Sequence, residues 1–407
     1  AFTRPPQNEI EIALEQLGGE EANVRLDDET SRLLRDELAR YPEAVALART
    51  VADYARGSHK LTIGPTILDT NLSETGGTRS VARLLLADAG IRAHDGDPDG
   101  AIESCRAILA VAQSIGDEPF LVSGFYRHAI WDSARRAITR VLAQGEVSDG
   151  ALAALQNDIL RTMNDPILAR NLRWERASLD EIIRRIRDAE IPIEGLNGGW
   201  KPGGPVPTVT PWGKRAFDYS RALGLEWMNR AEDITGMPIP DRLFFWREWR
   251  ADITDFKFST FWSSPASLAT TLIPEIEMAE TASTRCRTEQ ATMFYLVAAE
   301  RHRRRTGDWP ELIGDIGRDL LPEAPLDPFS GEDYVITRED GRFLVHSVGT
   351  NGEDDGGEYD PRTWRQYGPD DINAIAWDAA LRGLPPDEPE MPPAGNTAEM
   401  SDPDQTR

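Results

Sequence analysis

The sequence is poor in cysteine, histidine and basic residues. Its 407 residues include two cysteines and five histidines, and 45 lysines and arginines stand against 69 aspartates and glutamates. The formal charge of −24 argues against nucleic-acid binding, because affinity for nucleic acid comes mainly from basic side chains. Cys105 and Cys286 lie far apart in segments with a helical pattern, so we interpret them first as two buried thiols and only second as a disulfide. No apolar run approaches the roughly 20 residues of a membrane-spanning helix.

The sequence also lacks the motifs that identify most enzymes. No histidine is paired at the helical spacing that suits a zinc site, so we expect surface or packed residues at His59, His94, His128, His302 and His346. A Gly-x-Ser-x-Gly elbow for a nucleophilic serine is absent. The glycine-rich stretch GGWKPGG lacks the Lys-Ser/Thr pair of a phosphate-binding loop. We therefore favour a protein that is not an enzyme.

Helical periodicity is the main pattern that is present. It predicts a mainly α fold with a multi-helix body over residues 8–288. Residues 79–119 form two apolar-periodic segments separated by GDPDG, which resemble one tetratricopeptide-type hairpin or a generic helix pair. Residues 192–213 are so rich in proline and glycine that we expect a long loop there.

The pattern changes after Gly307. The stretch DYVITREDGRFLVHS contains two alternating runs around an Asp340-Gly341 turn, which is a strong signal for a β-hairpin. Residues 383–407 are acidic and contain no aromatic side chain, so we expect a disordered tail.

The densest group of acidic residues follows this hairpin. Residues 347–360, SVGTNGEDDGGEYD, place one asparagine and five acidic side chains among four glycines. Solvation of a surface turn explains such a run of charge, and so does a bound hard cation. Calcium suits the composition, because it takes six to eight oxygen ligands in a flexible arrangement.

Four motifs occur here in the order that is found in the globular part of the major pseudopilins of type II secretion. They are TGDWPEL (306–312), LPEAPLDPFSG (321–331), YVIT (334–337) and SVGTNGEDDGG (347–357). Residues 289–360 therefore resemble that domain. The whole chain resembles a group of uncharacterised bacterial envelope proteins in which a helical region precedes a pseudopilin-like domain. Phe2-Thr3 is followed by polar sequence rather than by the apolar anchor helix of a pilin.

The resemblance implies a small α+β domain at residues 289–365 and an extracytoplasmic location in the cell envelope or periplasm. It also implies a structural calcium ion, with side-chain ligands from Asn351, from one or both of Asp354 and Asp355, and from Asp360, and with main-chain carbonyls near Val348. We expect a structural or protein-interaction role with an unidentified protein partner. Any membrane attachment would come from an anchor upstream of Ala1.

The tryptophan-rich region 174–262 supports a different function. Seven tryptophans occur there beside many acidic residues. Aromatic platforms with paired carboxylates are features of glycan-binding sites and of glycosidases. The alternative function is therefore glycan binding or glycoside hydrolysis, unless these rings only fix the long loop onto the helices.

Overall fold

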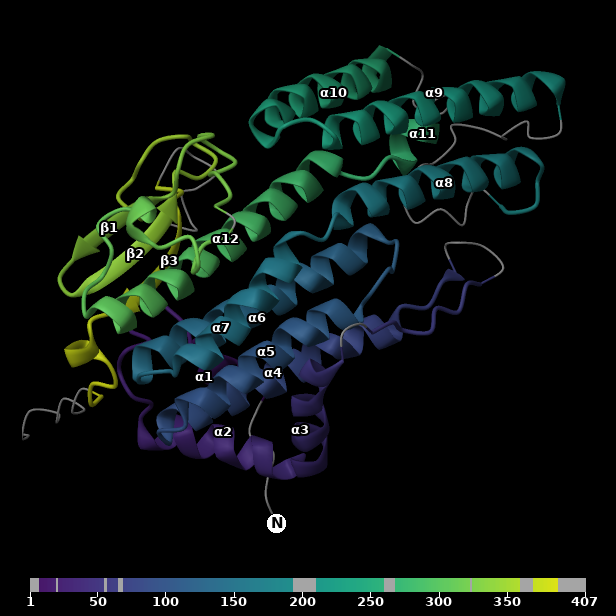
Figure 1. The fold of residues 1–407 in the computed structure, drawn as a ribbon. Coiled ribbons are helices and arrows are strands. Elements are labelled where there is room, and N and C mark those ends of the chain that lie inside the picture. The colour runs from purple at the N-terminus through teal and green to yellow at the C-terminus, as the bar shows by residue number, and fades with distance from the viewer. Residues whose placement is uncertain are drawn as a thin grey trace, which may run out of the picture.

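The structure is a computed structural model, and it describes residues 7–19, 21–54, 57–64, 69–192, 210–259, 268–322, 324–358 and 369–386. It is mainly helical, with one small antiparallel sheet near the C-terminal end, which confirms the expected fold class (Figure 1). Among the described helices, none combines the length and the apolar character needed to cross a bilayer.

The helices of the first half are α1 (Gln7–Glu15), α2 (Asp28–Arg40), α3 (Pro42–Arg49), α4 (Ser73–His94), α5 (Pro98–Ser114), α6 (Leu121–Gln144) and α7 (Asp149–Met163). Local sequence explains where several of them begin. The side chain of Asp97 accepts a hydrogen bond from Gly100 N–H at 3.1 Å, and that of Ser148 accepts one from Ala151 N–H at 3.3 Å. Such caps satisfy amide groups that have no partner inside the helix.

The second half contains α8 (Ile167–Arg187), α9 (Pro211–Thr235), α10 (Ile239–Ser259), α11 (Leu268–Leu272) and α12 (Ile276–Thr306). The expected loop at residues 192–213 overlaps the start of α9, where Pro211 occupies the first turn, and residues 193–209 lie outside the described part. Figure 1 shows α12 running from the α8–α11 group to the sheet.

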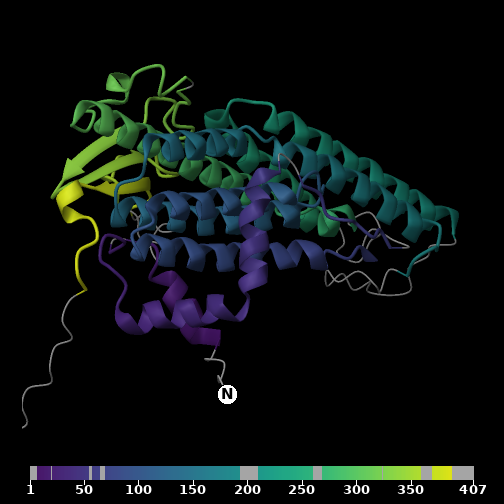
Figure 2. The ribbon, with the colours of Figure 1, turned by 60° about the horizontal axis from the view of Figure 1, so that its bottom comes forward.

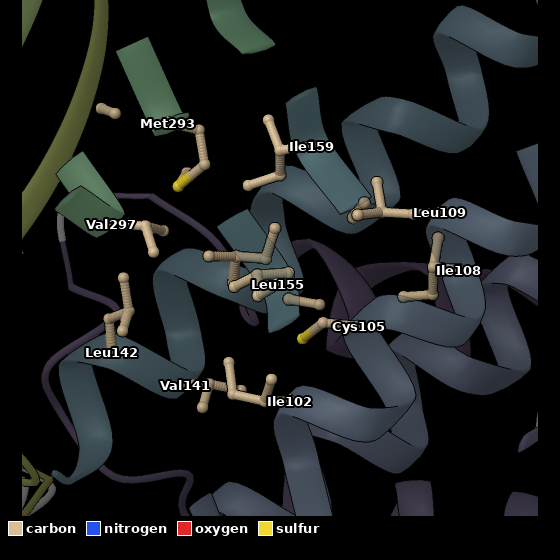
Figure 3. Close-up of a cluster of buried hydrophobic side chains, with 14 of the residues drawn as sticks. Ile102, Cys105, Ile108, Leu109, Val141, Leu142, Leu155, Ile159, Met293 and Val297 are labelled. Atoms are coloured by element: carbon tan, nitrogen blue, oxygen red, sulfur yellow. The ribbon is translucent and has the colours of Figure 1, made fainter. Parts of the chain in front are cut away.

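The largest hydrophobic core lies among α4, α5, α6, α7 and α12. Figure 3 shows Cys105 of α5 and Leu155 of α7 pointing into it, together with Val297 of α12. Helices α1, α2 and α3 pack against α4 on one side of this body (Figure 2). A second core, built by α8, α9, α10 and α11, includes Trp246 and Trp249 and reaches Ile276 at the start of α12.

The sheet has the order β1 (Val335–Glu339), β2 (Arg342–Ser347) and β3 (Ile372–Trp377), and all pairs are antiparallel. The predicted hairpin is present, with Asp340 at φ 50° and Gly341 at φ 71° in its turn. On the face toward α12, Phe343 is fully buried and stacks on Trp309 with 4.3 Å between the ring centroids.

The sheet and the helical body share one core, because α12 contacts α6 and α7 as well as β2 and β3. The expected boundary between residues 288 and 289 falls inside this helix. The chain after the sheet also joins the body: Gly383 N–H donates to Ala143 O at 3.0 Å, and Leu384 N–H donates to Asn23 O at 2.9 Å. The remainder of the expected tail, from residue 387 onward, lies outside the described residues.

Candidate metal centre

The segment that connects β2 to β3 begins with the acidic loop, residues 348–358. Its course depends on glycine: Gly349 has φ 63° and Gly357 has φ 87°, in the left-handed region that other residues rarely adopt. A side chain at position 349 would also overlap the carbonyl oxygen of Asp370. The loop therefore turns back closely against the start of β3.

Two fully buried aspartates just before β3 hold the loop through its backbone. Asp370 Oδ2 accepts a hydrogen bond from Thr350 N–H at 2.9 Å. Asp371 Oδ2 accepts from Asp355 N–H at 3.0 Å and from Gly357 N–H at 2.7 Å. Carboxylates are strong acceptors for such N–H groups, so the loop is fixed by charge-assisted hydrogen bonds.

A third buried aspartate acts in the same way from the opposite side. Asp327 accepts hydrogen bonds from Ser347 Oγ at 2.8 Å and from Val348 N–H at 3.1 Å. The Arg285 guanidinium of α12 lies 3.1 Å from Asp370 Oδ1. Internal donors and one arginine thus offset part of the mutual repulsion of the acidic groups.

The carboxylates of Asp354 and Asp371 converge on the imidazole of His346. The Nε2 atom of His346 lies 3.0 Å from Asp354 Oδ1 and 3.6 Å from Asp371 Oδ2. One ligand atom from each of the three residues lies within 4.8 Å of the others. His346 comes from the end of β2, Asp354 from the loop and Asp371 from the residue before β3.

Burial makes this group electrostatically unusual. His346 and Asp371 are both fully buried. Burial raises the pKa of the Asp371 carboxyl to about 6, although two backbone N–H groups and His346 act in the opposite direction. Within the described part of the chain, Asp371 Oδ1 has no hydrogen-bond partner. By contrast, hydrogen bonds from His346 and from Gly356 N–H lower the pKa of Asp354.

The residues predicted as calcium ligands lie in different places. Asp354 joins His346 and Asp371, as described above. Asn351 and Asp355 contact each other, since Asn351 Nδ2 donates to Asp355 Oδ2 at 2.9 Å. The N–H of Val348 faces an aspartate, and Asp360 lies outside the described residues.

Sequence reasoning missed His346 and Asp371. Asp371 lies 13 to 23 residues beyond the residues of the loop, and it comes into contact only because β3 pairs with β2, placing Ile372 opposite Ser347. The run INAIAW alternates in the way a strand does and was the available signal. Had β3 been predicted, the two aspartates that precede it would have been placed beside the loop.

The centre has a route to solvent. A hollow of about 700 Å³ is lined by residues of all three strands, of α6 and of α12, and Asp355 and Asp371 are part of its wall. Asp354 is itself about half exposed, at 52% of its side chain. A small ion can therefore reach these carboxylates without unfolding of the sheet.

The donor atoms suit a divalent cation, but the oxygens and the nitrogen among them favour different metals. The carboxylates of Asp354 and Asp371 supply oxygen ligands of the kind that calcium prefers. The imidazole nitrogen of His346 is instead typical of sites for zinc and other transition metals such as copper, iron and nickel. If calcium binds the carboxylates, His346 would lie outside the coordination sphere and orient Asp354. If the imidazole is itself a ligand, the site would select a transition metal.

The tryptophan-rich region does not form an aromatic platform in its described part. Trp246 and Trp249 are almost fully buried in the second core, and Trp249 Nε1 donates to Trp227 O at 2.8 Å. Trp212 is exposed at 68%, while Trp200 and Trp262 lie outside the described residues.

Some of the nearby carboxylates pair with arginines, among them Asp180, whose Oδ1 lies 2.5 Å from Arg221 Nε. Asp252 pairs with Arg230 in the same way.

Comparison of the chain with protein-family models, with curated proteins and with solved structures found no match.

Proposed function

We propose that the protein is a non-enzymatic, extracytoplasmic structural or protein-interaction protein whose C-terminal sheet is stabilised by a bound calcium ion. The observation that carries the proposal is the convergence of Asp354 and Asp371, with one buried oxygen of Asp371 lacking a partner in the described part. An unpaired carboxylate oxygen in a buried position is costly, and a cation removes that cost.

Six or more oxygens are needed to complete such a site. Asp354 and Asp371 would supply the first of them. The side chains of Asn351 and Asp355, which now bond each other, would supply more, and the resemblance to pseudopilins adds a carbonyl near Val348 and the Asp360 side chain.

The role of the ion would be structural. Asp354 and Asp355 belong to the loop after β2, and Asp371 directly precedes β3. An ion between them would tie the ends of two neighbouring strands and neutralise the repulsion along the loop. At a concentration 100 times its dissociation constant, such an ion adds about 2.7 kcal/mol to the stability of the fold.

Thermal unfolding of chelator-treated protein tests the proposal. We expect calcium at millimolar concentration to raise the melting temperature, and Asp371→Asn and Asp354→Asn to remove the increase. Asp340→Asn is the matched control, because Asp340 lies at the exposed hairpin turn outside the site, and it should respond like the wild type.

Parallel titrations with zinc and manganese identify the ion. A response to zinc alone, abolished by His346→Gln, would reject calcium and make the imidazole a ligand. No response to any divalent ion would reject the metal centre altogether. A calcium dissociation constant near 10⁻⁴ to 10⁻³ M would support an extracytoplasmic location, because sites in extracellular modules fall in about that range.

The interaction role has separate support. Leu47 of α3 and Tyr54, which follows the 3₁₀ turn Thr50–Asp53, are exposed at 71% and 68%, so both side chains are available to a protein partner. The glycan-active alternative has less support, because the described tryptophans mostly pack in the core and the nearby carboxylates Asp180 and Asp252 are paired with arginines.

A further inference from the structure

A second hollow lies in the helical body, far along the chain from the acidic loop. It has a volume of about 490 Å³ and opens where the end of α5, the end of α7 and the start of α8 meet. Its charged wall consists of Arg127, Arg161 and Arg170 with Asp117 and Asp165. The volume falls within the range of about 300 to 1,000 Å³ that is typical of small-molecule sites.

One carboxylate serves two of these arginines. Asp165 Oδ2 lies 2.7 Å from Arg127 Nη2, and its Oδ1 lies 3.1 Å from Arg170 Nη2. Arg170 also approaches Asp117 at 3.3 Å, but the Asp117 side chain is 87% exposed, so solvent weakens that pair.

The third arginine shares its carboxylate as well. Asp158 pairs with Arg161 and also lies 2.6 Å from Arg106 Nε. Four guanidinium groups in this region thus depend on two partly buried carboxylates and one exposed carboxylate. The wall of the hollow itself carries three arginines against two aspartates, so its formal charge is positive in a chain whose total formal charge is −24.

Two further features favour an anion. The Arg127 side chain is only 6% exposed, which strengthens its electrostatic interactions relative to a surface arginine. Pro166, which lines the hollow, precedes the first turn of the 21-residue helix α8, and among the described residues no side chain caps that end. The amide groups and the dipole at an uncapped helix start attract negative charge.

We propose that this hollow binds the oxyanion group of a small molecule, either a phosphate monoester or a carboxylate. Guanidinium groups bind both through paired N–H donors. The uncharged part of the hollow, which includes Gln113 and Asn164, would contact the body of the ligand.

Calorimetric titration of the full chain tests the proposal, with inorganic phosphate, glycerol 3-phosphate and succinate as probes against sodium chloride of equal ionic strength. Arg161→Gln should weaken binding about tenfold, because one charge-assisted hydrogen bond is lost. Asp117→Asn should tighten binding about threefold, because a negative charge at the rim is removed. Arg230→Gln on α9, an exposed arginine with its own aspartate partner, is the matched control and should bind like the wild type.

The two substitutions change exposed side chains, 55% and 87% exposed for Arg161 and Asp117, so both variants should fold. Tighter binding of glycerol 3-phosphate than of phosphate or succinate would assign a phosphate monoester, and the reverse order with succinate would assign a carboxylate. Absence of saturable binding by all three probes, or equal affinities in Arg161→Gln, Asp117→Asn and wild type, would overturn the proposal. None of these outcomes depends on the metal centre.

Discussion

The buried ion pair between Arg382 and Glu300 offers a sharp test of how the sheet is joined to the helices. Arg382 follows β3, and Glu300 lies on α12; their side chains are 2% and 0% exposed. Two parallel contacts join them, Nη1–Oε1 at 3.1 Å and Nη2–Oε2 at 2.9 Å. Arg382 Nε also donates to Trp377 O at 2.8 Å, so this one guanidinium holds the end of β3.

The substitution Arg382→Met should be strongly destabilising. Removing one partner of a buried ion pair costs about 3 to 5 kcal/mol, and we expect about 3 because Arg303 keeps Glu300 partly paired, at 2.8 Å and 3.0 Å. Burial by itself would raise the pKa of Glu300, but the hydrogen bonds from Arg303 and Arg382 outweigh it and lower the pKa. The contribution of the ionised Glu300 to the free energy of unfolding is therefore present above about pH 4.5 and is lost as the pH falls further.

Urea unfolding, followed by circular dichroism at pH 7 and at pH 4, measures this effect. Arg382→Met should lose more stability at pH 7 than at pH 4, because at pH 4 the carboxyl of Glu300 is partly protonated in the unfolded chain and the wild type has already lost part of this contribution. The double variant Arg382→Met with Glu300→Leu should be more stable than Arg382→Met alone, because an apolar pair no longer leaves a buried charge partly unpaired. A loss below about 1 kcal/mol in Arg382→Met would refute the reasoning, and so would a double variant as unstable as the sum of the single ones.

Two further predictions concern single positions. Burial lowers the pKa of His128 to about 4, so protonation favours the unfolded chain and stability should fall by up to about 3 kcal/mol between pH 6.5 and pH 4. His128→Gln should flatten this part of the pH profile in urea unfolding, whereas His302→Gln should not. Identical profiles for His128→Gln and the wild type would contradict this prediction. Gly349→Ala should cost about 1 to 3 kcal/mol more than Gly352→Ala in the same assay, because both have positive φ but only the first methyl group would overlap Asp370. Equal costs would show that the loop relaxes freely.

The periodic patterns in the sequence were sufficient to predict a mainly helical body and the β1–β2 hairpin. The alternation on both sides of Asp340-Gly341 sets the register of β1 and β2 locally, because a two-residue turn leaves few alternatives. The tetratricopeptide-like reading of residues 79–119 corresponds to the antiparallel pair α4 and α5, but their packing involves α6 equally. Which neighbours cover a helix face is a property of the whole chain and is not encoded in the segment.

Sequence patterns predicted the candidate site only in part. The glycines and acidic residues of the loop pointed to a tight turn rich in oxygen ligands, and Asp354 does meet other ligand atoms there. The contribution of His346 and Asp371 depends on the pairing of β2 with β3, two strands separated by 24 residues of chain. Contacts at that separation arise from tertiary packing, so spacing within one motif cannot reveal them.

The acidic loop also shows how like charges are held together in a folded chain. Asp327, Asp370 and Asp371 are buried, and each accepts at least one hydrogen bond from a backbone N–H group of the loop or of the segment beside it. The backbone dipoles therefore carry part of the compensation that a cation would otherwise have to supply. Within the described residues they leave one oxygen of Asp371 without a partner, and the half-exposed Asp354 lies beside it. Because that remainder lies at the junction of two strands, a cation bound there would stabilise the pairing of β2 with β3 more than it would stabilise the loop itself.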